Sequence, residues 1–212
     1  MKKYIKSLFL FCLSAIIMTG CSSPKMGASD SVLAIYNLYV KGDSEGVLKL
    51  GMKQEDVNSN LTSYDVSLMD QLKTSMTSAG LTIEDTVLTE IIEARKTALK
   101  TMTASCELVS SEKETAVVLL KTTYFDEAAL DEKAANDAIA KAQESGSTDA
   151  DEMLTLATGY YAQNLIDSYR AVTPSEDMKE LTVNCVLSGG VWLPEDVKVF
   201  GEELGSVITG QK

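Results

Sequence analysis

The sequence predicts an α+β domain in which helices pack against an antiparallel sheet made of two hairpins. Apolar residues recur at helical spacing on either side of two segments, 104–124 and 181–193, in which apolar and polar residues alternate. The Ser188-Gly189-Gly190 turn joins two of these alternating runs, as a tight hairpin turn does. Because helices and strands are grouped along the chain and do not strictly alternate, an α+β fold is favoured over a parallel one.

The N-terminal part of the predicted domain is expected to be mostly helical. A helix capped by Ser29 or Asp30 runs to about Val40, and it is apolar on more than one side. Such a helix is typically held against a sheet. A second, short helix is expected over residues 44–50, and the polar segment 51–63 is expected to be a turn-rich loop.

Two longer helices are predicted at 65–79 and at about 85–102, and Arg95 lies on the apolar stripe of the second. An arginine at such a position either pairs with a buried carboxylate or lays its stem along the core. We expect the second, commoner arrangement, in which the guanidinium group reaches water.

The first predicted hairpin covers residues 104–124, with its turn at 110–113. Its second strand is apolar on both faces, which predicts a strand that is central or covered on both sides. Residues 126–172 then predict an inserted helical hairpin whose first helix, small and charged on its faces, is expected to be exposed. A C-terminal helix is predicted after 194–196, where a proline and two acids suit a first turn.

Residues 1–20 have the pattern of a secretory signal peptide. Lys2, Lys3 and Lys6 make a basic start, and the apolar run at 8–18 is too short to span a membrane. A cysteine, two serines and a proline follow the apolar run. The sequence therefore predicts export from the cytoplasm.

The signal ends in the letters MTGC, in which a small residue precedes Cys21. This resembles the lipobox of bacterial lipoproteins. The resemblance implies that Cys21 is lipidated and that the protein is held at the outer face of the membrane. Residues 21–28 have the composition of a flexible tether, and the length of 29–212 suits a single domain. Because each buried acyl CH₂ contributes about 0.8 kcal/mol, several chains give a stable anchor. The alternative is a secreted protein with a stray cysteine at the cleavage site.

Composition excludes several classes of function. The chain has no histidine, which excludes serine and cysteine triads as normally built and also His-bearing metal sites. Its net charge of −12 argues against nucleic-acid binding. No phosphate-binding loop, calcium loop or dinucleotide motif is present, so we expect neither a cofactor nor a metal.

Cys106 and Cys185 both fall on apolar faces of predicted strands. Outside the cytoplasm a disulfide between them is permitted, so they form either a cross-sheet bridge or two buried thiols. We favour the thiols, because a domain of this size has a core of its own and does not need one bridge.

Four aromatic residues are the candidates for a ligand pocket between the first helix and the sheet: Tyr36, Tyr39, Tyr124 and Trp192. The alternative, which we favour, is that these rings fill the hydrophobic core.

The element order, with the letters GGVWLPED on the late return strand, resembles the NTF2-like or cystatin-like fold. With the lipobox it also resembles a group of functionally uncharacterised lipoproteins of Gram-positive bacteria. These folds host enzymes, ligand binders and assembly modules alike, so the resemblance implies no fixed chemistry. The inserted helical hairpin departs from the simple fold.

The sequence therefore predicts a lipid-anchored, extracytoplasmic module that is not catalytic. Its partners would be the membrane, through the lipid, and either a small ligand or an envelope protein. The alternative is a surface hydrolase that uses carboxylates, for which the sequence singles out no pair of acids. A structural spacer or inhibitor is a third hypothesis.

Overall fold

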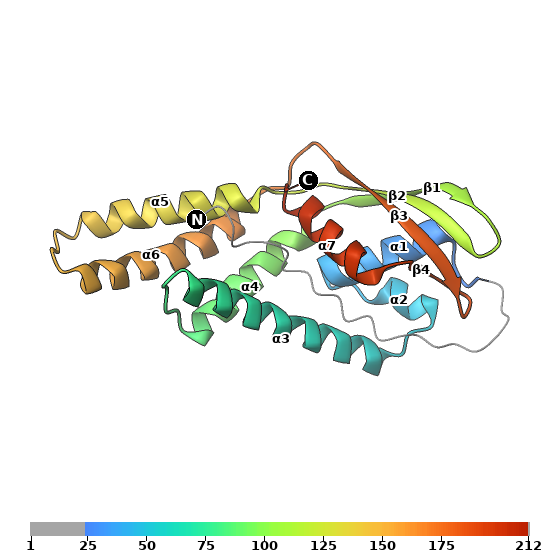
Figure 1. Cartoon of the computed structure of the whole chain (residues 1–212), viewed down its shortest axis with the longest axis horizontal. Coiled ribbons are helices and arrows are strands. Elements are labelled where there is room, and N and C mark those ends of the chain that lie inside the picture. Colours follow the sequence, from blue (N-terminus) through green and yellow to red (C-terminus); the bar gives the residue numbers. More distant parts are fainter. Residues whose placement is uncertain (1–23, 212) are drawn as a thin grey trace.

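The computed structural model describes residues 24–211, which form helices packed against a four-stranded antiparallel sheet (Figure 1). The predicted signal peptide and the lipidation of Cys21 lie outside the described residues. In chain order the elements are α1 (Ala28–Tyr36), the π-helix η1 (Asn37–Lys41), α2 (Glu45–Leu50), α3 (Gln54–Ser78), α4 (Asp85–Lys100), β1 (Ala104–Ser111), β2 (Thr115–Thr122), α5 (Glu127–Gln143), α6 (Ala150–Ala171), β3 (Lys179–Ser188), β4 (Val191–Pro194) and α7 (Val197–Ile208).

The strands pair in the order β1-β2-β3-β4, so the predicted α+β class and the two hairpins are confirmed. Val118 of β2 lies opposite Leu108 and Val183, and its side chain is fully buried. β2 therefore lies inside the sheet, which is one of the two arrangements predicted for this strand, the other being a strand covered on both faces. α1 and α7 contact the same face of the sheet, while Thr182 and Asn184 on the other face are exposed. The sheet is therefore covered on one face.

The tight turn predicted between β3 and β4 is present, and it explains the two glycines. Gly189 and Gly190 have φ angles of 58° and 79°. This left-handed region is strained for residues with a Cβ atom and easy for glycine, and it suits the twist of a hairpin.

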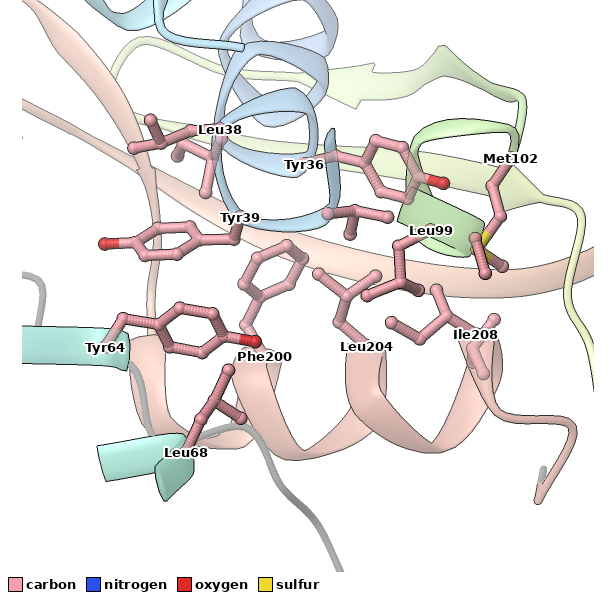
Figure 2. Packing of buried hydrophobic residues seen from close by; sticks show 14 of the residues in the cluster. Tyr36, Leu38, Tyr39, Tyr64, Leu68, Leu99, Met102, Phe200, Leu204 and Ile208 are labelled. Carbon is pink, nitrogen blue, oxygen red and sulfur yellow. The ribbon is translucent and has the colours of Figure 1, made fainter. Parts of the chain in front are cut away.

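The main core lies between the sheet and α7, with side chains from α1, α3 and α4 completing it (Figure 2). Phe200, Leu204 and Ile208 follow one another at a spacing of four residues, so they lie on one face of α7. All three are buried, and Figure 2 shows them pointing toward Tyr36, Leu99 and their neighbours.

The first predicted helix is present, but its details differ from the prediction. It begins at Ala28 behind an N-cap at Gly27, so neither Ser29 nor Asp30 is the cap. The α-helix ends at Tyr36 and widens into the π-helix η1, which ends before Gly42 at a φ of 71°. Gly46 lets α2 lie close to α1, since a Cβ atom there would come within 2.6 Å of the Ala34 Cβ.

The prediction of a loop over 51–63 is wrong, because α3 begins at Gln54. The segment is polar on most of its surface, and only a narrow stripe made by Val57, Asn60 and Tyr64 is buried. Those three positions fit the spacing of one helix face. Packing of this stripe stabilises a helix that composition alone does not indicate.

The inserted helical hairpin is confirmed, with Asp126 accepting a hydrogen bond from the Ala129 amide at the start of α5. The expectation that α5 is exposed is only partly right. Ala134, Ala138 and Ala142 are buried where α5 packs against α6, because small side chains let two helices approach closely. Figure 1 shows the α5–α6 pair projecting away from the sheet, and α6 also contacts α4.

Among the helices of residues 24–211, none combines the length and the hydropathy that crossing a membrane requires.

Candidate functional site

A cavity of about 280 Å³ lies between α3, α4, α5 and α6, away from the sheet. Its walls are mainly apolar, with Leu72 and Met76 from α3, Ile91 and Ile92 from α4, and Leu165 from α6. Ile139 and Leu154, two half-exposed apolar residues near the tip of the hairpin, also border it. The cavity is therefore apolar and reachable from solvent.

A buried ion pair forms one part of the cavity wall. Arg95 Nε donates a hydrogen bond to Glu127 Oε1 over 2.6 Å, and the two side chains are only 5% and 3% exposed. The prediction that the guanidinium of Arg95 reaches water is wrong, because the side chain is buried. The carboxylate that offsets the cost of burying the charge comes from the inserted hairpin, 32 residues further along the chain.

Two tyrosines surround the guanidinium group. Burial raises the pKa of Tyr64 to about 12, with Arg95 opposing the rise through its charge and a hydrogen bond. Burial also raises the pKa of Tyr169, and the charge of Glu127 raises it further. Both hydroxyls therefore stay protonated at neutral pH. Burial alone would lower the pKa of Arg95, but the charges of Glu127 and the tyrosines raise it overall, so the arginine stays charged.

A second polar pair lines the same cavity one helical turn further along α5. The Tyr161 hydroxyl donates a hydrogen bond to Asp131 Oδ1 over 2.5 Å. Burial and this hydrogen bond raise the pKa of Tyr161, so its hydroxyl is neutral. Within residues 24–211, no lysine or arginine is in ion-pair contact with Asp131. Arg95 neutralises Glu127, so the cavity wall keeps the negative charge of Asp131.

The spacing of residues on α5 and α6 explains how the chain forms this site. Glu127, Asp131 and Ala135 recur every four residues, and so do Tyr161, Leu165 and Tyr169, so each set lies on one helix face. On the α5 face, Glu127 and Asp131 are followed by Ala135, whose small side chain leaves the cavity open. The sequence signals that could have pointed here are an arginine inside an apolar stripe and acids in line with alanines.

A second cavity, of about 400 Å³, lies on another side of α6, against α4 and the loop before it. Its lining mixes apolar residues with Thr82, Glu84, Glu90 and Gln163. It is more polar than the first cavity and contains no buried ion pair among the described residues.

The four predicted pocket aromatics lie elsewhere, and none lines either cavity. Tyr36, Tyr39 and Trp192 are buried in the hydrophobic core. The hydroxyl of Tyr36 bonds Thr122 Oγ1 over 2.7 Å, and Tyr39 meets Tyr64 edge-on with centroids 5.9 Å apart. Tyr124 is half-buried, with Lys179 Nζ 5.0 Å from the centre of its ring.

Cys106 and Cys185 are free thiols in the structure. Cys106 pairs with Leu120 and Cys185 with Ala116, so β2 lies between them. Two strand spacings alone place the Cα atoms at least about 9–10 Å apart, and the four-residue offset between Leu120 and Ala116 along β2 adds to this, whereas a disulfide needs less than about 7 Å. Burial raises the pKa of Cys106 to about 12 and that of Cys185 to about 11, so both thiols are protonated at neutral pH.

No cluster of three or more His, Cys, Asp or Glu side chains that could hold a metal ion occurs in the described part of the chain. The polar groups of the first cavity are instead paired with one another, and they are arranged around an apolar space.

No protein-family model matches the chain, and no curated protein matches it. Among solved structures, the chain is similar to that of a candidate lipoprotein, ycdA, from Bacillus subtilis subsp. subtilis str. 168. The two sequences are 16% identical, and the structures superpose with a TM-score of 0.63. The match covers 87% of this chain and 56% of the chain of the neighbour. This likeness shows a shared fold, and this chain spans about half the length of its structural neighbour.

Proposed function

We propose that this protein is a lipid-anchored, extracytoplasmic module that binds a small apolar ligand in the cavity between α3, α4, α5 and α6, without catalysis. The anchor is supported by Cys21 in its MTGC context and by the lipoprotein description of the structural neighbour from a Gram-positive bacterium. An NTF2-like or cystatin-like domain remains our proposal for the fold family. Its support is a sheet of two hairpins with helices on one face.

The observation that carries the proposal is the open apolar space itself. Protein interiors are packed to the density of organic crystals, and voids larger than a water molecule are few. An apolar cavity of about 150 Å³ takes up benzene. The cavity here, about 280 Å³, has room for a body roughly twice that size.

The energetics favour an aliphatic or aromatic ligand. Each methylene removed from water contributes about 0.8 kcal/mol, so a chain of about eight carbons supplies several kcal/mol. Lost translational freedom offsets part of this gain. We therefore expect binding in the micromolar to millimolar range for a simple apolar compound.

The hydrolase alternative has less support. A pair of catalytic carboxylates must face each other across the substrate. Glu127 and Asp131 instead lie one turn apart on the same wall, and Glu127 already holds Arg95. Because Glu127 is paired with Arg95 and Asp131 with Tyr161, these carboxylates are better placed to line a binding site than to act as a catalytic pair.

The test is binding of octanol, a neutral apolar probe, to the full chain carrying Cys21→Ala, which excludes lipidation. Titration calorimetry should show saturable binding. Ala135→Leu should weaken it by occupying part of the cavity, whereas Ala140→Leu, the same change at an exposed position of α5, should leave it intact. Failure of octanol to bind, or equal binding to both variants, would contradict the proposal.

A further inference from the structure

We propose that the ligand is an apolar amine whose protonated nitrogen binds the carboxylate of Asp131 while its apolar body fills the cavity. This inference rests on the proposed function and adds the chemical class of the ligand. The charges on the cavity wall, the hydrogen-bonding capacity of Asp131 and the cavity volume support it.

The charges on the wall do not cancel. Three ionisable side chains with a formal charge line the cavity: Arg95, Glu127 and Asp131. Arg95 and Glu127 neutralise each other over 2.6 Å. Among the described residues, Asp131 accepts a hydrogen bond only from the hydroxyl of Tyr161, which is neutral. A ligand that enters this space therefore meets one net negative charge beside an apolar surface.

Asp131 also has hydrogen-bonding capacity to spare. An ionised carboxylate offers about four acceptor positions on two oxygens, and Tyr161 occupies one of them on Oδ1. Asp131 is in the second turn of α5, beyond the first turn where the helix dipole stabilises acids most. A ligand ammonium group would supply both the donors and the charge that this position lacks.

An anionic ligand such as a fatty acid fits the site less well, although an arginine is present. The guanidinium of Arg95 is already bonded to Glu127 and surrounded by Tyr64 and Tyr169. A carboxylate that approached it would come close to Glu127 and Asp131, which are both negative. Like charges at close range in a partly desolvated site repel strongly. The arrangement therefore selects for a cation.

The experiment compares three probes with the same chain length: octylamine, octanol and octanoate. Each is titrated by calorimetry into the full chain carrying Cys21→Ala, at about 0.15 M salt to screen the acidic surface. We expect octylamine to bind about tenfold tighter than octanol, as a charge-assisted hydrogen bond provides. Octanoate should bind more weakly than octanol.

Two variants locate the effect. Asp131→Asn keeps an acceptor for Tyr161 but removes the charge, so octylamine and octanol should then bind equally well. Glu132→Gln removes one charge from the adjacent, exposed position of α5, outside the cavity lining, and should leave the preference unchanged. Octanol binding to Asp131→Asn shows that this variant is folded.

The outcomes separate the two proposals. If octanol binds but octylamine binds no tighter, or if Asp131→Asn keeps the preference, the amine inference is overturned and the apolar ligand site stands. If octanoate binds most tightly, the inference is overturned in the same way. If none of the three probes binds, the proposed function fails and the inference fails with it.

Discussion

The core beneath the sheet and the cavity between α3, α4, α5 and α6 bury similar apolar side chains but leave different amounts of space. Val118, Leu120 and Leu204 are fully buried in the core that α1 and α7 form with the sheet. On the helical side, alanines on α5 leave about 280 Å³ open, and a charged pair is buried in its wall.

The difference separates the side of the molecule that is packed for stability from the side on which we propose that a ligand binds. Replacing a buried ion pair by well-packed apolar residues is often neutral or stabilising. A fold that needed only stability would therefore fill this space with leucine. Open volume combined with polar groups is what a binding site requires, because the volume admits the ligand and the polar groups orient it. Four predictions test this comparison, starting with the largest expected effect.

Breaking the buried ion pair should be the most destabilising of these changes. Glu127→Gln leaves the guanidinium of Arg95 buried without its counter-charge, which costs about 3–5 kcal/mol in the free energy of unfolding. The matched control is Glu90→Gln, which breaks the exposed pair between Arg170 and Glu90 and should cost less than about 1 kcal/mol. Urea unfolding measures both.

The double variant Arg95→Met with Glu127→Leu sharpens this test. Because both charges of the pair are removed together, its stability should return close to that of the wild type. Equal costs for Glu127→Gln and Glu90→Gln would contradict the assignment of the ion pair as buried.

The same truncation should have different effects on the two sides of the molecule. Leu204→Ala creates a new void in the filled core and should lower the free energy of unfolding by about 2–5 kcal/mol. Leu72 is half-buried and already borders open space, so Leu72→Ala should cost less than half as much. Denaturant midpoints with unchanged slopes would measure the difference, and equal losses would show that the cavity side is packed as tightly as the core.

The two sides also differ in how far the sequence predicts them. The sheet follows from local patterns, since alternation places Leu181, Val183 and Cys185 on one face and two glycines specify the turn. The start of α3 was missed because its buried stripe is narrow within a polar segment. That helix depends on tertiary contacts that periodicity does not reveal.

The cavity was missed for a different reason. The pocket candidates in the sequence are four aromatic residues, because large rings often line binding sites, and the favoured prediction is that these rings fill the core. The cavity instead lies where side chains are small, as at Ala135 and Ala138. An alanine that borders a cavity has no sequence pattern that distinguishes it from an alanine in a filled core. Periodicity placed Arg95 on a buried face, but its partner Glu127 lies on an inserted element whose position depends on the whole fold.

Enlarging a side chain should also affect the two sides of the molecule differently. Ala116→Leu inserts a larger side chain into the filled core beneath the sheet and should cost about 1–3 kcal/mol through overpacking. Ala135→Leu makes the same change at the cavity, where there is room, and should alter the free energy of unfolding by less than about 1 kcal/mol. Thermal unfolding of both variants measures the contrast. A large loss for Ala135→Leu would mean that the space is not available.

The smallest expected effect concerns alkaline pH on the sheet side. Burial raises the pKa of Tyr36 to about 12, with its hydrogen bond to Thr122 opposing the rise. The unfolded chain ionises this tyrosine near pH 10. The contribution of the neutral hydroxyl is therefore complete below about pH 10 and is lost as the pH rises toward 12.

At about pH 11 this linkage amounts to about 1.4 kcal/mol. Tyr36→Phe should be less stable than the wild type at neutral pH, because the bond to Thr122 is lost. Between about pH 7 and 11, however, it should lose about 1.4 kcal/mol less than the wild type, since phenylalanine does not ionise. The other buried tyrosines and the two thiols titrate alike in both proteins and cancel in the difference. Urea unfolding at the two pH values measures it, and an identical loss in both proteins would show that Tyr36 ionises in the folded state as readily as in the unfolded one.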